Sequence, residues 1–255
     1  MNYIIGAVTD IGIRKEKNQD SIYSSVINTS KGKMAFSVVC DGLGGLSEGE
    51  VASASVVYAF RNWIATRLKQ LCKEEVTEEK IKEEWCNLLK WQNERLRKYG
   101  LQKGIMLGTT VVAILVTATN YYVIHIGDSR LYEIGKDINQ ITTDQTLVQR
   151  QIEEGKMTIE EAKDSKDKHI LLQCCGTMDV MIPEFICGKT KEHTTYILCS
   201  DGFYHKISLK EMYDSFSSNV CLDEKQISIQ SNYLIELNKK RGEEDNMSVT
   251  VIKTC

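Results

Sequence analysis

Aspartates that directly follow apolar runs are the residues of this sequence best suited to chemistry. In "VVCDGLGG" (38–45) an apolar run ends at Asp41, and glycines occupy three of the next four positions. The same order recurs in "YILCSDGF" (196–203), where Asp201 and Gly202 follow the apolar residues. A single Asp-Gly pair after a strand is typical of a turn, because Asp hydrogen-bonds its own backbone and Gly tolerates positive φ. Each pair alone therefore predicts only a turn.

Three further aspartates lie at similar breaks. Asp128 falls between two apolar runs, Asp245 precedes the last apolar run, and Asp20 follows "GIRKEKNQ", which contains Arg14. Side chains at the ends of different strands can converge, and clustered carboxylates repel one another unless a cation lies among them. Taken together, the five aspartates predict a cation site.

The predicted ion is a hard divalent cation. Mg²⁺ and Mn²⁺ take oxygen ligands, including carboxylates, backbone carbonyls and water. A buried strand would fix Asp41 as one ligand, and a glycine beside it exposes its backbone to close approach. The pattern therefore predicts Asp41 as a metal ligand and the carbonyl of Gly42 as a ligand to a second ion.

Strands must position these residues. Seven short runs rich in Val, Ile and Tyr, bounded by Gly, Asp or Asn, predict strands. The predicted strands are 3–9, 34–40, 109–117, 121–126, 130–134, 196–199 and 247–252. Only "ATN" separates 109–117 from 121–126, which predicts a hairpin.

Helices separate these strands. Residues 48–71 carry apolar side chains at three- and four-residue steps, which predicts one apolar face. A second helix is predicted from 77 to about 99, with Thr77 as N-cap and acidic residues in the first turn. A third is predicted near 223–241, before Gly242.

A further helical piece, 146–168, is highly charged and interrupted by Gly155, so it predicts a surface flap and not a core element. The order of strands and helices does not follow the strict alternation of a parallel sheet. It favours an α+β fold with mixed, mostly antiparallel sheets and helices packed outside. One proline and no Ser/Gly-rich linker or repeat favour a single domain over 1–255.

Composition restricts the function. A net charge of −3 and a pI near 5.9 argue against a nucleic-acid partner. The longest apolar stretch, 109–119, is too short to cross a bilayer, and the N-terminus lacks the pattern of a signal peptide. We therefore expect a cytoplasmic protein without a membrane partner.

Cysteine and histidine give no sign of a zinc site. The nine cysteines are odd in number and form no C-x-x-C pair, which predicts reduced thiols in the core. The four histidines are scattered without H-x-x-x-H spacing, so no zinc site is predicted; they are His125, His169, His193 and His205.

Seven motifs in order resemble the PP2C-type metal-dependent serine/threonine protein phosphatases, in their short bacterial form. They are "RKEKNQD" (14–20), "DGLGG" (41–45), "GTT" (108–110), "GDSRLY" (127–132), "TTDQTLVQRQIEEGKMTIEEA" (142–162), "SDGF" (200–203) and "DNMSV" (245–249). The resemblance runs from about residue 6 to 252. It implies an αββα sandwich of two mostly antiparallel sheets flanked by helix pairs, with a flap near 145–180 beside the active site.

The resemblance also implies the roles of the site residues. Asp41 would bridge two Mn²⁺ or Mg²⁺ ions, with Asp201 and Asp245 completing the first and the Gly42 carbonyl contributing to the second. Asp128, with Asp201, would hold a third ion. Asp20 would support metal-bound waters, and Arg14 would hold the phosphate oxygens.

The implied reaction is hydrolysis of phosphoserine and phosphothreonine in proteins by direct attack of a metal-bridging hydroxide. Two positions depart from the family. Gln19 stands where many members carry Glu, so we expect weaker binding of the second metal. Leu43 stands where eukaryotic members have a histidine, so a metal-bound water or solvent would protonate the leaving group.

Two other functions fit the sequence. One is a catalytically weak or inactive phosphatase-like module that binds phosphoproteins or acts as a scaffold. The other is a Bergerat-type ATPase, since "DGLGG" is similar to its D-x-G-x-G box, but the 40 residues before Asp41 do not predict the helix that such a fold needs. For the phosphatase, we expect a monomer that opposes a serine/threonine kinase.

Overall fold

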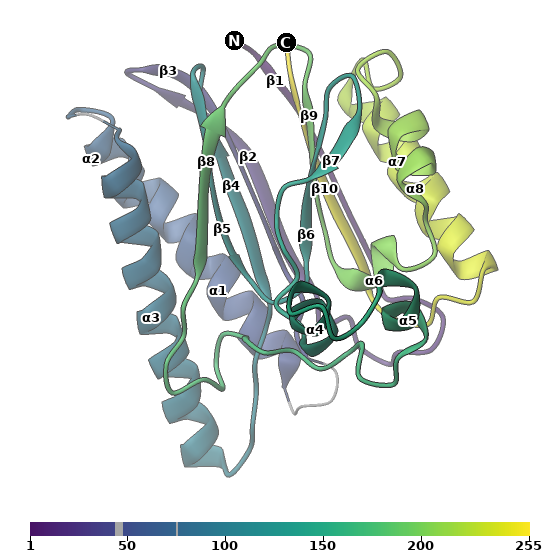
Figure 1. Cartoon of the computed structure of the whole chain (residues 1–255). Coiled ribbons are helices and arrows are strands. Elements are labelled where there is room, and N and C mark those ends of the chain that lie inside the picture. The colour runs from purple at the N-terminus through teal and green to yellow at the C-terminus, as the bar shows by residue number, and fades with distance from the viewer. Residues whose placement is uncertain (44–47, 75) are drawn as a thin grey trace.

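The computed structural model describes residues 1–43, 48–74 and 76–255 (Figure 1). Two five-stranded sheets pack face to face, and helices cover both outer faces. Every strand pairing among the described residues is antiparallel. The predicted α+β, four-layer αββα sandwich is therefore confirmed.

Each sheet combines strands from distant parts of the chain. The first contains, in spatial order, β1 (Tyr3–Asp10), β10 (Met247–Thr254), β9 (Thr195–Cys199), β6 (Arg130–Ile134) and β7 (Ile138–Gln140). The second contains β2 (Ser21–Thr29), β3 (Gly32–Cys40), β4 (Val111–Val116), β5 (Asn120–Ile126) and β8 (Glu184–Lys189).

All seven predicted strands are present, and β4 and β5 form the predicted hairpin. The sequence did not predict β2, β7 and β8, and each of them lies at the edge of its sheet. Their side chains are mostly only partly buried, in contrast to the fully buried β4. An edge strand needs no continuous apolar run, which explains why these three carry a weak sequence signal.

A long helical pair covers the second sheet. α1 (Gly49–Trp63), the π-helical turn η1 (Ile64–Leu68) and α2 (Lys69–Leu71) form the helix predicted at 48–71. α3 (Glu78–Lys103) begins after the predicted cap Thr77, whose side chain accepts the Lys80 N–H, and continues past 99 to Gly104, which has φ 68°. No helix within the described parts of the chain is long and apolar enough to span a membrane.

The first sheet is covered by α7 (Leu209–Phe216) and α8 (Glu224–Lys240), while the short α6 (Asp201–Tyr204) follows β9. α8 confirms the helix predicted near 223–241, and Asp223 caps it by accepting the Gln226 N–H. α6 and α7 were not predicted. α7 begins with a reciprocal capping box between Ser208 and Glu211.

Three apolar layers hold the sandwich together. One lies between the second sheet and α1 and α3, where Phe36, Phe60 and Trp63 surround the buried Trp85. Another lies between the first sheet and α7 and α8. The third lies between the two sheets. Since aromatic side chains bury the largest apolar areas, the cluster around Trp85 anchors the α1–α3 layer.

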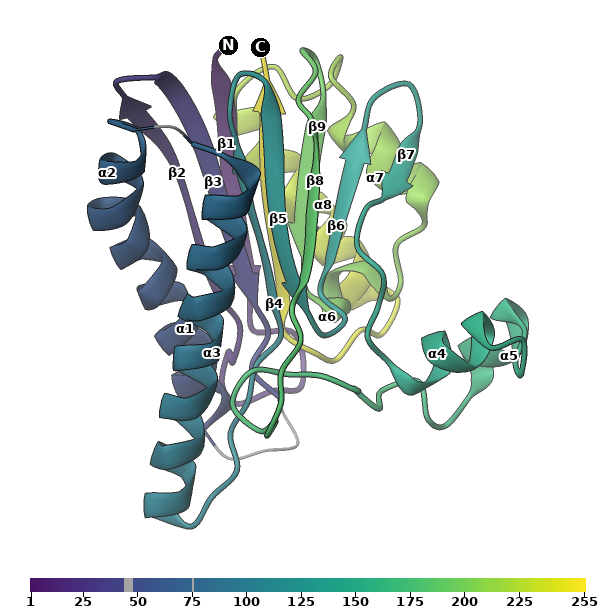
Figure 2. The same cartoon turned by 60° about the vertical axis from the view of Figure 1, so that its left-hand side comes forward.

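The flap, residues 145–180, leaves the sandwich between β7 and β8. It carries α4 (Leu147–Glu153) and α5 (Ile159–Asp164), which project from one end of the molecule (Figure 2). Gly155, with φ 68°, ends α4 as the sequence predicts. At the neck of the flap, Thr146 forms a β-bridge with Leu171.

Candidate metal centre

The five predicted aspartates lie at the same end of the two sheets. Antiparallel pairing aligns the end of β3 with the start of β2, through Cys40 and Ser21. It likewise aligns the end of β9 with β10 and with the start of β6. The aspartates adjoining these strand ends are Asp20, Asp41, Asp128, Asp201 and Asp245.

Their carboxyl groups interact, and Asp41 is at the centre. Burial, followed by the negative charges of the other four aspartates, raises the pKa of Asp41 well above its ordinary value. The convergence expected from the sequence is therefore present. A carboxyl group in such surroundings ionises readily only when a cation compensates its charge.

Asp20 and Asp128 show the same effect. Burial is the main cause that raises the pKa of Asp20 to about 7, and hydrogen bonds from Ser200 and Ser248 oppose it. Ser200 Oγ donates to Asp20 Oδ2 over 2.8 Å. Burial and the charge of Asp201 raise the pKa of Asp128 to about 8. All three groups thus resist ionisation in the protein alone.

Threonines behind β3 fix the backbone of Asp41. The Asp41 N–H donates to Thr110 Oγ1 over 3.0 Å, and Thr109 Oγ1 donates to the Asp41 carbonyl over 2.8 Å. Thr110 Oγ1 also lies 2.6 Å from Ser129 Oγ, next to Asp128. The "GTT" and "GDS" motifs therefore connect the turns that carry two of the aspartates.

Gly42 lies where no side chain fits. A Cβ at this position would lie 2.4 Å from the Gly49 carbonyl oxygen and 2.6 Å from that of Gln19. The Gly42 N–H donates to the Gln19 carbonyl over 3.1 Å. Gly44 and Gly45 of the same motif lie outside the described residues.

Asn246 holds the loop between β1 and β2. Its Oδ1 accepts the Gln19 N–H over 2.8 Å, and its Nδ2 donates to the carbonyls of Ile11 and Lys17. This loop carries Asp20 and the basic residues before it. The residue after Asp245 thus fixes a segment more than two hundred positions away, a role that the "DN" pair does not reveal.

The basic residues of this loop point in different directions. Arg14 is 74% exposed, and its Nη1 lies 2.5 Å from Glu244 Oε2. Lys15 is less exposed, and its Nζ lies 2.7 Å from Asp245 Oδ1. Although burial lowers the pKa of Lys15, the hydrogen bond to Asp245 and the charges of Asp41 and Asp201 raise it overall. Lys15, which sequence reasoning missed, is thus the cation that faces the aspartates.

Two observations show that these residues fit divalent cations. Asp20 Oδ1 and Asp201 Oδ1 are buried without a hydrogen-bond partner, so each has an oxygen free for a further ligand. The ammonium of Lys15 already lies against the cluster as a positive charge. The donors are carboxylate oxygens, which hard cations such as Mg²⁺ and Mn²⁺ prefer.

The flap forms one wall of a neighbouring cavity of about 920 Å³, which Asp128 also lines. Arg130, which also lines this cavity, forms a bidentate ion pair with Asp144 at 2.9 and 2.7 Å and stacks over Tyr204. The Tyr204 hydroxyl donates to the Asp128 carbonyl over 3.1 Å. The cavity therefore gives a substrate room beside the aspartates.

Comparison with known proteins places the chain among phosphatases. Residues 13–228 match the sequence profile of the protein phosphatase 2C family. Protein phosphatase PhpP of Streptococcus pneumoniae is 27% identical over 251 residues, which cover 97% of this chain and 96% of PhpP. The match thus spans nearly the full length of both proteins.

Solved structures agree with this match. The serine/threonine phosphatase of S. agalactiae superposes with a TM-score of 0.80 at 25% identity, and the match covers all of both chains. The catalytic domain of the serine/threonine protein phosphatase PstP, in complex with two manganese ions, superposes with a TM-score of 0.75 at 26% identity over 99% of each chain. The fold and the sequence therefore identify the same group of proteins.

Proposed function

The chain belongs to the protein phosphatase 2C family of metal-dependent serine/threonine phosphatases, and we propose that its five converging aspartates form the catalytic metal centre. The chain dephosphorylates phosphoproteins in a metal-dependent reaction. The observation that carries the proposal is the charge of four other aspartates acting on Asp41. Such a cluster is stable in its ionised form only around cations.

The proposed ligands follow from their positions. Asp41 would be a ligand to two Mn²⁺ or Mg²⁺ ions, Asp201 and Asp245 would be further ligands to the first, and the Gly42 carbonyl would contribute to the second. Asp128, together with Asp201, would hold a third ion. The unpartnered Asp201 Oδ1 and the raised pKa of Asp128 support this assignment.

When bound, the ions supply an acidified water as nucleophile and positive charge for the phosphoryl oxygens. Asp20 then orients water at the centre, because Ser200 fixes its Oδ2 while Oδ1 has no other partner. Lys15 and Arg14, on one loop beside Asp245, hold the phosphoryl oxygens of the substrate. No residue of the chain needs to form a covalent intermediate.

The protein would act as a single domain over 1–255, and the pairing of β1 with β10 supports this because it joins the two ends of the chain in one sheet. We further propose a cytoplasmic monomer whose phosphoprotein substrates are phosphorylated by an opposing serine/threonine kinase. The family membership supports this setting.

Asp41→Asn tests the metal centre. It removes one charge at the centre of the cluster, so Mn²⁺-dependent hydrolysis of para-nitrophenyl phosphate should fall at least a hundredfold, on the order of the loss of a group acting in the transition state. The free energy of unfolding in chelator should stay unchanged or rise, because carboxylate repulsion is relieved.

The matched control is Asp137→Asn, an exposed aspartate in the turn between β6 and β7. It should leave turnover at the wild-type level. Wild-type turnover in Asp41→Asn would refute the assignment, and absence of Mn²⁺-dependent turnover in the folded wild-type chain would favour the inactive binding module.

A further inference from the structure

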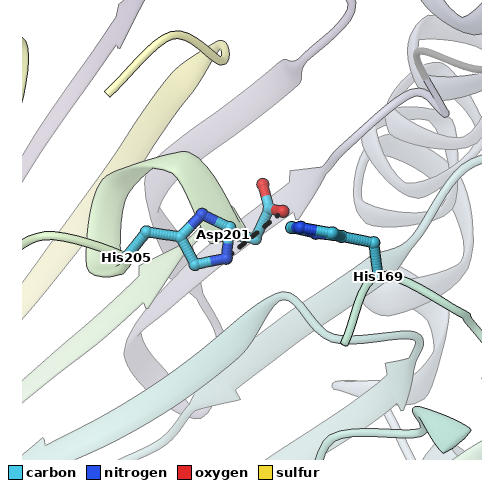
Figure 3. A group of neighbouring side chains, drawn as sticks. All are labelled: His169, Asp201 and His205. Atoms are coloured by element: carbon cyan, nitrogen blue, oxygen red, sulfur yellow. Dashed lines mark ion pairs between the residues drawn. The ribbon is translucent and has the colours of Figure 1, made fainter. Parts of the chain in front are cut away.

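Two histidines and an aspartate meet at the edge of the flap cavity. His169 belongs to the flap, while Asp201 is the first residue of α6 and His205 directly follows its last residue (Figure 3). One ligand atom from each of these residues lies within 4.8 Å of the other two. Although the three are scattered in the sequence, the fold brings them to one point.

The pair on α6 already has the spacing of two ligands. His205 Nε2 lies 3.6 Å from Asp201 Oδ2. Zinc binds histidine nitrogens and carboxylate oxygens at about 2.0–2.2 Å, so two such ligands on a tetrahedral ion lie roughly 3.4 Å apart. Figure 3 shows the His169 ring directed at the same carboxylate from the opposite side.

A second carboxylate orients His205. Its Nδ1 lies 3.5 Å from Glu243 Oε2, so the two ring nitrogens face two different acids. Glu243 Oε1 is fixed by the backbone N–H groups of Glu244 and Asp245. Metal-binding histidines commonly donate their second nitrogen to a carboxylate, which fixes the tautomer and makes the ring a stronger ligand. Glu243 is therefore placed to accept a hydrogen bond from the second ring nitrogen of His205 and to fix its tautomer.

The donor set favours a class of ion different from that of the acidic cluster. Imidazole nitrogens suit Zn²⁺ and similar transition metals, whereas Mg²⁺ and Mn²⁺ prefer oxygen ligands. Three protein ligands with a fourth position open to water are typical of an accessible zinc site. His169 is exposed and the His205 side chain is 31% exposed, so an ion can enter from solvent.

We propose that His169, Asp201 and His205 bind a Zn²⁺-type transition-metal ion that ties the flap to α6. One ligand comes from the flap and two come from the sandwich, so binding cross-links the two parts. The sequence had predicted no zinc site, because spacing along the chain does not reveal histidines that meet only in the fold.

The site shares one residue, Asp201, with the proposed catalytic centre. Asp201 faces His205 with Oδ2, while its Oδ1 is the buried oxygen without a hydrogen-bond partner. The carboxylate can therefore serve both centres, one with each oxygen. His169 contributes to the second centre alone.

His169→Gln tests the proposal in the Mn²⁺-loaded protein. Isothermal titration with Zn²⁺ should show a site whose affinity falls at least tenfold in the variant, because one of three ligands is lost. Zn²⁺ should also slow tryptic cleavage of the wild-type flap after Lys163, Lys166 and Lys168, and should not do so in the variant. Since His169 is exposed on the flap, the variant should fold with a free energy of unfolding close to that of the wild type.

Two further variants complete the experiment. His205→Gln should lose the same affinity, whereas His193→Asn, in an exposed turn with φ 57° that Asn tolerates, should bind Zn²⁺ like the wild type. Equal Zn²⁺ affinity and equal protection of the flap in wild type and His169→Gln would overturn the proposal. A wild-type chain that binds Zn²⁺ but lacks Mn²⁺-dependent turnover would contradict the catalytic assignment and leave this site standing.

Discussion

Gly42 lies where the backbones of three segments meet, and this gives a direct test of the frame around Asp41. Gly42→Ala should lower the free energy of unfolding by more than about 2 kcal/mol, because its Cβ would lie 2.4 Å from the Gly49 carbonyl oxygen. Gly135→Ala is the matched control, since no atom lies within 4 Å of a Cβ there. Chemical denaturation measures both, and equal stability of the two variants would contradict the close approach.

Lys15 and Arg14 contact different acidic residues, so their variants should change KM to different extents. Lys15→Met should raise KM for a phosphopeptide several-fold with a smaller change in kcat, because the Lys15 ammonium lies against the aspartates. Arg14→Met should raise KM less, because its guanidinium is exposed and paired with Glu244. Steady-state kinetics at saturating Mn²⁺ measures both. A larger effect of Arg14→Met would make Arg14, and not Lys15, the main contact to the phosphoryl oxygens.

These two neighbours also show what the sequence could not decide. The aspartates could be singled out because each lies beside an apolar run or, for Asp20, directly after the segment that contains Arg14. The choice between Arg14 and Lys15 depends on how Asn246 holds the loop, and that contact joins residues far apart in the chain. His169 and His205 escaped prediction for the same reason.

Helix α3 fixes the base of the flap through one buried side chain. Asn93 Oδ1 accepts the Gly176 N–H and its Nδ2 donates to the Met178 carbonyl, both over 2.8 Å. Asn93→Ala should cost about 2 kcal/mol of stability, because it leaves the buried Gly176 N–H and the half-buried Met178 carbonyl unpaired. It should also speed proteolysis within the flap.

The control for Asn93→Ala is Gln102→Ala, on the exposed end of the same helix. It should change the free energy of unfolding by no more than about 0.5 kcal/mol. The rate of flap cleavage should stay at the wild-type level. Flap cleavage that is equally fast in both variants would show that α3 does not hold the flap.

Among the elements, predictability follows position in the sheets. Buried central strands such as β4 need apolar residues on both faces, so their runs are unmistakable. Edge strands such as β2 mix polar and apolar residues without a clear period and were missed. The capping side chain of Thr77 marked the start of α3, whereas α7 was missed although Ser208 and Glu211 form a capping box. Short α6 carries no such cap, because the Ser200 hydroxyl bonds Asp20 instead.

In the absence of metal, the buried acidic cluster lowers the free energy of unfolding of the whole molecule, and the size of this effect depends on pH. The pKa of Asp20 is about 7 and that of Asp128 about 8 in the folded chain, against an ordinary value of 3.8. Between pH 3.8 and about pH 8 the folded chain holds more protons than the unfolded chain. The free energy of unfolding therefore falls as pH rises. The stability contributed by these groups is full below their ordinary pKa and lost by about pH 8.

Thermal unfolding in chelator measures this effect. The midpoint should fall between about pH 5 and pH 8, and Mn²⁺ should reduce the fall because ionised carboxylates then bind a cation. Asp128→Asn should flatten the pH dependence in chelator. A midpoint that rises over this range in the metal-free protein would contradict the raised pKa values of Asp20 and Asp128.

The strands at the two chain ends, β1 and β10, lie side by side. The Asn2 N–H donates to the Cys255 carbonyl over 2.8 Å, and the Cys255 N–H donates to the Asn2 carbonyl over 2.9 Å. Both ends lie at the opposite end of the sheets from the flap helices and from α6, which begins with Asp201 (Figure 1). A tether to a surface, a fluorophore or a fused protein attached there would leave the aspartates accessible. A few added residues would also suffice to close the backbone into a ring.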